Sequence, residues 1–118
     1  MRKLLMMLCG VIMLAISGCL PCDGEFVLPQ NAVLLDVRTP EEHQEGYIAG
    51  AMLIPLAELE SRLSDSIPAK NTPVYIYCRS GRRSGIAVEK LKSLGYSDVY
   101  NLGGLDDARK QLGLPIKK

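Results

Sequence analysis

The sequence predicts an α/β domain of three layers, in which helices flank a central, mostly parallel sheet. Short β-branched and aromatic runs, such as residues 74–77, alternate with stretches whose apolar residues recur at helical spacing, such as residues 86–94. Strands that alternate with helices form parallel βαβ units. The chain has 118 residues, 47% of them hydrophobic, so it is long enough for one core and too short for two domains.

The first 18 residues have the pattern of a signal peptide. Arg2 and Lys3 precede an apolar run, residues 4–16, which ends in small residues before Cys19. The motif of residues 16–19 (Ile-Ser-Gly-Cys) resembles the lipobox of bacterial lipoproteins. We therefore expect residues 1–18 to be removed and Cys19 to carry the lipid that attaches the protein to a membrane. An ordinary secretory signal or an uncleaved anchor is the alternative.

Residues 19–24 are expected to form a short tether before the domain, residues 25–118. Similar lipoproteins that stay at the inner membrane carry aspartate after the lipidated cysteine, whereas this chain has Leu20. We therefore expect an outer-membrane anchor that faces the periplasm. Thiols are oxidised in that compartment. With Cys19 acylated, Cys22 and Cys78 are the two free thiols, and we expect no stable bridge between them because the tether points toward the membrane.

The charge of the chain gives no sign of a nucleic-acid partner. The net charge is +1, and basic residues form no stripe outside the loop after Cys78 and the pair at the carboxyl terminus. A nucleic-acid partner is therefore not expected. We expect the protein to be a monomer.

The first strand and helix of the domain have clear signals. Residues 33–35 form an apolar run that ends in Asp36, Val37 and Arg38, as expected for a central parallel strand buried on both faces. The next helix has an N-cap, a proline at its first position, a capping-box acid and a terminating glycine: Thr39, Pro40, Glu42 and Gly46.

The remaining elements follow in alternation. Residues 51–54 predict a short strand that Pro55 ends, and leucines at helical spacing predict a helix over residues 56–64. After the strand at residues 74–77, a helix is expected to end at Gly95. We then expect a strand at residues 98–101, a turn at Gly103 and Gly104, and a helix over residues 105–112.

Cys78 is the candidate nucleophile. It stands at the carboxyl end of a buried strand, and residues 79–83 must turn at once into a helix. Unpaired N–H groups at a helix amino terminus favour an anion, so they lower the pKa of a nearby thiol. Gly81 permits a tight turn, and three arginines gather positive charge around the sulfur. A small buried core cysteine is the alternative interpretation.

Residues 78–84 (Cys-Arg-Ser-Gly-Arg-Arg-Ser) resemble the active-site loop of single-domain rhodaneses, which carry sulfur on a cysteine as a persulfide. Residues 34–42, 48–55 and 101–104 resemble other blocks of that family, and the likeness covers about residues 25–114. The resemblance implies a rhodanese-like fold and thiosulfate sulfurtransferase activity through a persulfide on Cys78. It also implies a substrate-binding loop made of Arg79, Ser80, Gly81, Arg82, Arg83 and Ser84.

The same resemblance implies the reactants. The donor would be thiosulfate or another sulfane compound, and the acceptor cyanide, a small thiol or a thioredoxin-like protein. No cofactor and no metal are implied, and the sequence has no paired Cys or His spacing that would suggest zinc. Asp36 and Arg38 are expected to support the loop as a structural salt bridge.

Three other functions use a cysteine or a fold of this kind. A cysteine hydrolase needs a histidine base, but the single histidine, His43, is expected to lie solvated on the polar face of its helix. Phosphatases of the Cys-x5-Arg type need arginine where this chain has Ser84, since Arg83 comes one residue early. A noncatalytic rhodanese-like module that carries sulfur or binds a partner is the main alternative, although such modules commonly lose the cysteine.

Overall fold

A four-stranded parallel sheet forms the centre of the domain. The computed structural model describes residues 27–118. The strand order is β3-β1-β4-β5, with bounds Met52–Leu53, Val33–Asp36, Val74–Cys78 and Val99–Gly104. The helices are α1 (Pro40–Glu45), the 3-10 turn η2 (Leu56–Glu58), α2 (Leu59–Ser66), α3 (Arg82–Ser93) and α4 (Leu105–Leu112). A separate antiparallel pair joins β2 (Tyr47–Ile48) to β6 (Ile116–Lys117).

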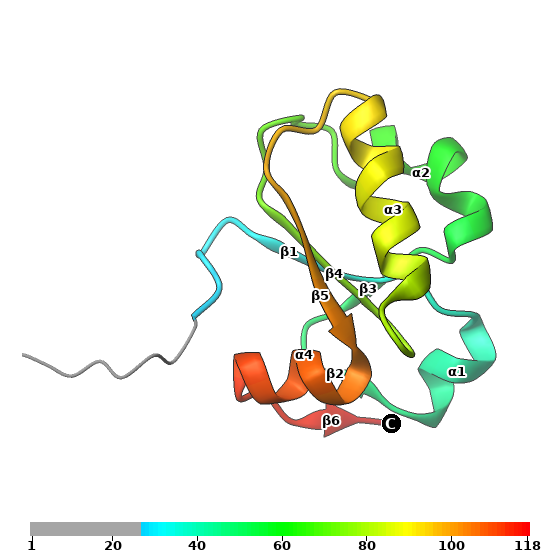
Figure 1. Cartoon of the computed structure of the whole chain (residues 1–118), viewed down its shortest axis with the longest axis vertical. Coiled ribbons are helices and arrows are strands. Elements are labelled where there is room, and N and C mark those ends of the chain that lie inside the picture. Colours follow the sequence, from blue (N-terminus) through cyan, green and yellow to red (C-terminus); the bar gives the residue numbers. More distant parts are fainter. Residues whose placement is uncertain (1–26) are drawn as a thin grey trace, which may run out of the picture.

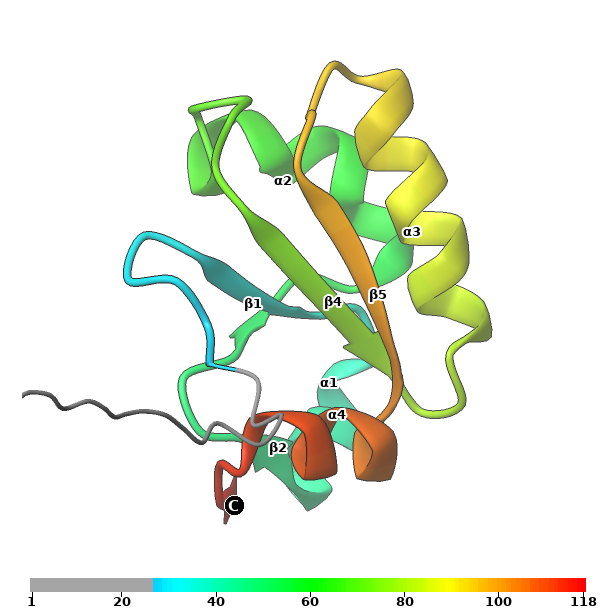
Figure 2. The ribbon, with the colours of Figure 1, turned by 60° about the vertical axis from the view of Figure 1, so that its left-hand side comes forward.

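Helices cover both faces of this sheet, which gives three layers. In Figures 1 and 2, α2 and α3 lie on one face, and α4 with the β2–β6 pair lies on the other. Successive residues of a strand point to opposite faces, so β4 contributes to both cores. Val74, Ile76 and Cys78 join the core under α2 and α3, whereas Tyr75 and Tyr77 join the core beside α4. The predicted fold class is confirmed.

The predicted start of α1 is also confirmed. The Thr39 hydroxyl accepts the Glu42 N–H at 3.2 Å, and the Glu42 carboxylate accepts the Thr39 N–H at 3.0 Å. Pro40 occupies the first turn and Gly46 caps the end of the helix. These contacts fix α1 at the carboxyl end of β1, where its acidic first turn faces the loop that follows Cys78.

Three details differ from the sequence-based expectations. The β2–β6 pair was not predicted, because a strand of two residues shows no alternation of apolar and polar side chains. Gly103 and Gly104 belong to β5 instead of forming a turn after it, and they pair with Tyr77 and Cys78. The helix expected over residues 56–64 begins as the 3-10 turn η2 and continues as α2 to Ser66.

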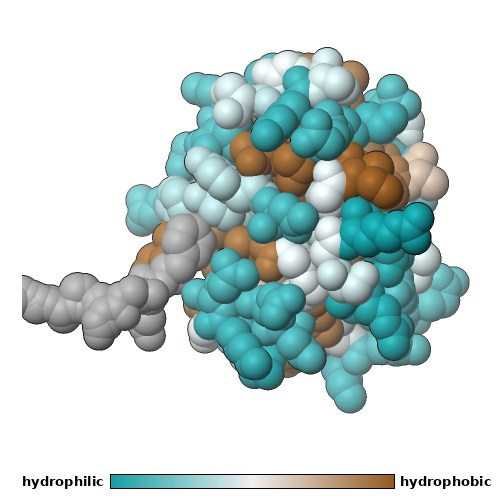
Figure 3. Space-filling view, viewed as in Figure 1, coloured by the Kyte–Doolittle hydropathy of each residue, from teal (hydrophilic) through white to brown (hydrophobic). Residues whose placement is uncertain are grey.

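The surface of the domain is mostly hydrophilic in the view of Figure 3, where hydrophobic residues form small separate areas. Among residues 27–118, no helix is long and apolar enough to cross a membrane. The predicted signal peptide, the lipidated Cys19, the tether and Cys22 lie outside the described residues.

Candidate active site

Cys78 is the last residue of β4, and the end of this strand leads through a short loop into α3 (Figure 2). Its side chain is completely buried. The N–H of Gly81, the N-cap residue of α3, donates to Cys78 Sγ at 2.9 Å. Gly81 has a φ of 98°, in the left-handed region that favours glycine. This backbone conformation turns the loop back on itself and directs the N–H at the sulfur.

The environment of the sulfur lowers the pKa of the Cys78 thiol. Burial raises this pKa by withdrawing the charged form from water, but hydrogen bonds to the sulfur outweigh burial. The bonds come from the Ser84 side chain and from the backbone of Ser84, Ser80 and Gly81. The prediction of a thiol that faces backbone amides is confirmed by this geometry. Its role as a nucleophile stays a prediction.

The loop packs tightly against the end of β5. A Cβ on Gly104 would lie 2.5 Å from the Arg79 carbonyl oxygen, and a Cβ on Gly81 would lie 3.2 Å from Gly103 Cα. Ser80 also forms an isolated bridge with Gly104. The two glycines at residues 103 and 104 therefore let β5 approach the backbone of the loop, and they hold the loop in the shape that surrounds the sulfur.

Ser84 lies inside this arrangement and not on its surface. It is completely buried in the first turn of α3, with its Oγ 3.5 Å from Cys78 Sγ. The same hydroxyl lies 3.1 Å from the Gly81 carbonyl and 2.6 Å from Asn101 Oδ1 on β5. Ser84 is therefore placed to act on the sulfur itself. The N-cap of α3 is Gly81.

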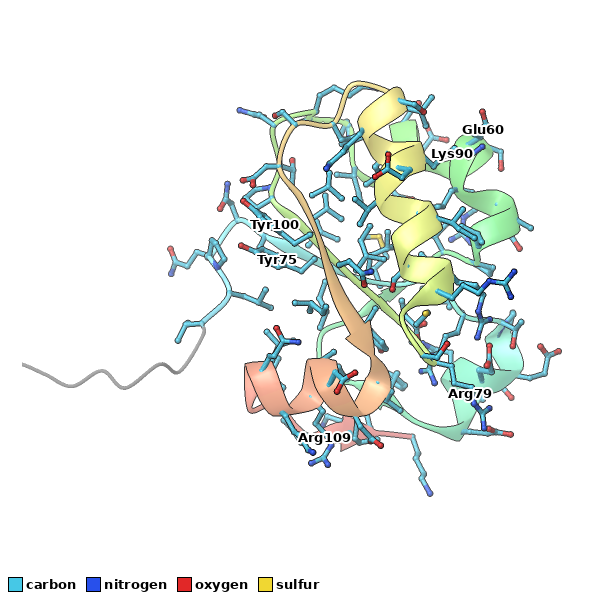
Figure 4. The ribbon with its side chains drawn as sticks, in the orientation of Figure 1. Glu60, Tyr75, Arg79, Lys90, Tyr100 and Arg109 are labelled. Carbon is cyan, nitrogen blue, oxygen red and sulfur yellow. The ribbon has the colours of Figure 1, made fainter. Side chains whose placement is uncertain are left out.

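The three arginines differ in their surroundings. Arg83 forms two hydrogen bonds with the Glu42 carboxylate, at 2.8 and 3.0 Å, and they lower the pKa of Glu42 to about 2. Arg79 lies between the loop and α1 (Figure 4), with its side chain 73% exposed and 3.8 Å from the same carboxylate. Arg82 is exposed. Arg79 and Arg82 therefore carry the positive charge that faces solvent.

Asp36 and Arg38 form the expected salt bridge. Arg38 Nε and NH2 donate to the Asp36 carboxylate at 2.8–3.1 Å, and both residues are buried. Arg38 NH2 also donates to the Gly46 carbonyl at 2.6 Å, so the pair joins β1 to the end of α1. The Tyr77 hydroxyl donates to Asp36 at 3.2 Å, and burial raises the pKa of Tyr77 to about 12.

The prediction for His43 was wrong. Its Nδ1 lies 2.9 Å from Asp36 Oδ2, its ring stacks on Tyr47 with centroids 4.1 Å apart, and its side chain is only 17% exposed. The helical pattern did not reveal this because the partner, Asp36, lies on another element. His43 therefore belongs to a cluster with Asp36, Arg38 and Tyr77, which joins α1 to β1 and β4.

A polar cavity of about 550 Å³ opens beside the loop. Its lining includes Arg79 and Ser80 of the loop, Arg38 after β1, and the acidic residues Glu45, Asp106 and Asp107. A second cavity of about 370 Å³ lies at the end of α4 and contains none of the predicted site residues. The space next to the predicted substrate loop is thus the polar cavity.

The family of the chain follows from its matches to known proteins. Residues 27–111 match the Rhodanese-like domain family. The chain belongs to this family. It is 47% identical over 93 residues to the thiosulfate sulfurtransferase PspE of Escherichia coli, covering 77% of this chain and 89% of the relative. It is also 42% identical to a sulfurtransferase of Allochromatium vinosum, covering 74% and 79%.

The solved structures agree with this assignment. The rhodanese fold matches a structure described as a rhodanese with anions from E. coli, with a TM-score of 0.66 and 41% identity. That match covers 74% of this chain and 98% of the solved chain. These relatives support sulfur transfer as the general activity of this chain.

Proposed function

We propose that this rhodanese-like protein moves sulfane sulfur from thiosulfate, or a similar donor, to a thiophilic acceptor through a persulfide on Cys78. The observation that carries the proposal is the Gly81 N–H at 2.9 Å from Cys78 Sγ, at the amino terminus of α3. This arrangement stabilises an anionic sulfur and gives a buried cysteine the character of a nucleophile. A structural core cysteine has no need of such donors.

In the first step, the Cys78 thiolate attacks the outer sulfur of thiosulfate. A bond forms between the two sulfurs, the sulfur–sulfur bond of thiosulfate breaks, and sulfite leaves with the electron pair. The anionic persulfide then takes the place of the thiolate within reach of the loop amides. Because Cys78 has no exposed surface, the donor must gain access to the sulfur before this step.

In the second step, an acceptor nucleophile takes the outer sulfur and Cys78 becomes the thiolate again. Cyanide gives thiocyanate, and the thiolate of a small thiol or a thioredoxin-like protein gives a persulfide of the acceptor. The loop amides receive the returning negative charge, so the protein stabilises anionic sulfur before and after each transfer. No cofactor and no metal are required by these two steps.

Capture of a dianionic donor is assigned to the exposed arginines. Arg79 and Arg82 face solvent beside the loop, whereas Arg83 is held by Glu42. Positive charge at the mouth of a site raises the local concentration of anions. Ser80, Gly81 and Ser84 are assigned to the sulfur itself through their backbone or hydroxyl groups, and Asp36 and Arg38 are assigned a supporting role.

We also propose that the mature protein is a lipid-anchored monomer in the periplasm, attached to the outer membrane through Cys19. The lipobox-like motif of residues 16–19 and Leu20 after it support this location. The small size of the hydrophobic areas on the face shown in Figure 3 is in keeping with a monomer.

Replacement of the sulfur tests the reaction directly. Cys78→Ser is nearly isosteric, but serine is not ionised at neutral pH, so sulfur transfer from thiosulfate to cyanide should be lost while the unfolding midpoint stays close to that of the wild type. Substantial activity in this variant would reject the assignment. A folded variant without activity supports the catalytic function over a noncatalytic module.

A further inference from the structure

The orientation of the Asn101 amide is determined by two backbone groups. Asn101 Oδ1 accepts the Gly103 N–H at 2.8 Å, and Nδ2 donates to the Gly81 carbonyl at 3.3 Å. An N–H group only donates and a carbonyl oxygen only accepts, so the amide oxygen must face Gly103. The same oxygen lies 2.6 Å from Ser84 Oγ. The Ser84 hydroxyl is therefore the donor in that contact.

This contact uses the single hydrogen of the Ser84 hydroxyl. Three acceptors surround the hydroxyl: Asn101 Oδ1 at 2.6 Å, the Gly81 carbonyl at 3.1 Å and Cys78 Sγ at 3.5 Å. While the hydrogen points to Asn101, Ser84 Oγ offers only lone pairs to the sulfur. Such an oxygen accepts a hydrogen bond from a neutral thiol, but it repels a thiolate.

Ionisation of Cys78 reverses this preference. A thiolate has no hydrogen to donate, and it is stabilised when the Ser84 hydroxyl rotates and donates to Sγ. Asn101 permits that rotation, because its Oδ1 keeps the hydrogen bond from the Gly103 N–H. The hydroxyl therefore has two alternative acceptors, and no heavy atom has to move when it changes between them.

We propose that Asn101 is a positioning residue for sulfur transfer, which acts on Cys78 by competing with its sulfur for the hydrogen of the Ser84 hydroxyl. By favouring the neutral thiol, Asn101 limits how far the loop amides stabilise the thiolate. Thiolates of very low basicity are weak nucleophiles, so this limit preserves the reactivity of the sulfur. This role rests on the proposed function, since it concerns the same nucleophile.

Charged groups also lie on the elements around Cys78, and the test leaves all of them in place. They lie on β1, in the segment directly after β1, on α1, in the loop, on α3 and on α4: Asp36, Arg38, Glu42, Arg79, Arg82, Arg83 and Asp107. Arg83 is the member whose charge interacts with Cys78, and Glu42 holds it in position. Because these charged residues are the same in all variants, differences in the pKa of Cys78 report the effect of the Asn101–Ser84 contact.

The test measures the pKa of Cys78 from the pH dependence of its alkylation by iodoacetamide, followed by mass spectrometry of the Cys78 peptide. The midpoint of such a profile is independent of a constant access factor, so burial of the sulfur does not disturb it. Turnover is not needed either. Failure of this proposal is therefore distinguishable from failure of the proposed sulfurtransferase activity.

Two substitutions should shift the midpoint in opposite directions. Asn101→Leu removes the competing acceptor and should lower the pKa, giving a change of about threefold in the acid dissociation constant. Asn101→Asp keeps the acceptor, makes it stronger and adds negative charge, so it should raise the pKa by at least as much. The exposed Asn71, in the turn before β4, gives the matched control Asn71→Leu, which should leave the midpoint unchanged.

The same Asn101 substitutions in a Ser84→Ala background test whether Asn101 acts on Cys78 through the Ser84 hydroxyl. Without the hydroxyl, Asn101→Leu should no longer lower the pKa, and Asn101→Asp should retain only the part caused by its charge. A purely structural role predicts that both Asn101 substitutions loosen the loop and shift the pKa in the same direction. That result, or an effect of Asn101→Leu that persists in Ser84→Ala, would overturn the proposal. If Ser84→Ala fails to fold, the direction of the Asn101→Leu shift decides, because loss of the competing acceptor lowers the pKa whereas a loosened loop loses hydrogen bonds to the sulfur and raises it.

Discussion

Arg83 on α3 and Glu42 on α1 form a two-bond ion pair, at 2.8 and 3.0 Å, which joins these two helices. The Glu42 carboxylate also closes the capping box with Thr39. One carboxylate thus caps α1 and positions the first turn of α3. The Glu42 side chain is 18% exposed and the Arg83 side chain 32% exposed, so solvent screens their interaction only in part.

This ion pair predicts an acid-sensitive contribution to stability. The pKa of Glu42 falls from 4.5 to about 2 in the folded protein, so its contribution is fully present above pH 4.5 and is lost as the pH falls toward 2. Glu42→Gln keeps a capping-box side chain but removes the charge. We expect it to cost about 1–2 kcal/mol at pH 7 and much less at pH 2.5.

Urea unfolding at both pH values checks this expectation. The matched control is Glu41→Gln, which removes an acid from the same helical turn and should have a small effect at either pH. A cost of Glu42→Gln that is the same at pH 7 and pH 2.5 would contradict the assigned role of the ion pair.

Neutralising the exposed arginines should weaken donor capture. Arg82→Gln and Arg79→Gln are expected to raise the KM for thiosulfate by several-fold with a smaller change in kcat, because they act before the chemical step. Rising salt should raise the KM of the wild type in the same way. Steady-state kinetics at two ionic strengths measure both effects. If the KM stays the same in both variants, these arginines are ordinary surface residues without a role in donor capture.

Arg83→Gln should behave differently from these two variants. It removes the two hydrogen bonds that Arg83 makes to Glu42, so it should lower the free energy of unfolding by about 1 kcal/mol in addition to any kinetic effect. Equilibrium unfolding of the three variants distinguishes Arg83, which should contribute to stability, from Arg79 and Arg82, which should not. Equal stability of all three would show that the contact with Glu42 contributes nothing measurable.

The approach of β5 to the loop predicts that Gly104 does not tolerate a methyl group. A Cβ there would lie 2.5 Å from the Arg79 carbonyl oxygen, so Gly104→Ala must displace the loop and should abolish most of the sulfur transfer. Gly85→Ala is the control, since its Cβ would meet only Asn101 Nδ2 at 3.4 Å. Inside α3 it should be neutral or stabilise by up to about 1 kcal/mol. Full activity of Gly104→Ala would show that the close approach of β5 to the loop is not required for sulfur transfer.

Lipidation of Cys19 is tested in cells. With the signal pattern intact, the full-length protein should incorporate labelled palmitate and partition into membranes, and Cys19→Ala should do neither. Membrane fractionation then distinguishes the outer from the inner membrane. Wild-type protein without label, recovered in the soluble periplasmic fraction, would identify an ordinary secretory signal.

Much of the fold could be predicted because its signals are local. The capping box at Thr39, the apolar run at residues 33–35 and the helical spacing after Gly81 each depend on neighbours in the sequence. The β2–β6 pair could not be predicted, since Tyr47 and Lys117 meet only through the tertiary fold.

The site was predictable to the same extent. Cys78, with a turn and a helix directly after it, indicates a sulfur that faces backbone amides. The partners of the site residues are long-range: Glu42 binds Arg83, His43 binds Asp36, and Asn101 reaches Ser84. Two signals pointed to Asn101, its place at the end of a predicted parallel strand and the likeness of residues 101–104 to a rhodanese block, but neither gave a role for the side chain.

The most direct test of the central claim is mass spectrometry of the mature protein after incubation with thiosulfate and removal of excess donor. The peptide that contains Cys78 should gain one sulfur atom, and cyanide should remove that sulfur and yield thiocyanate in equal amount. Cys78→Ser should gain none. If the added sulfur is absent from the Cys78 peptide, or if it is found equally on other cysteines such as Cys22, then Cys78 is not the sulfur carrier.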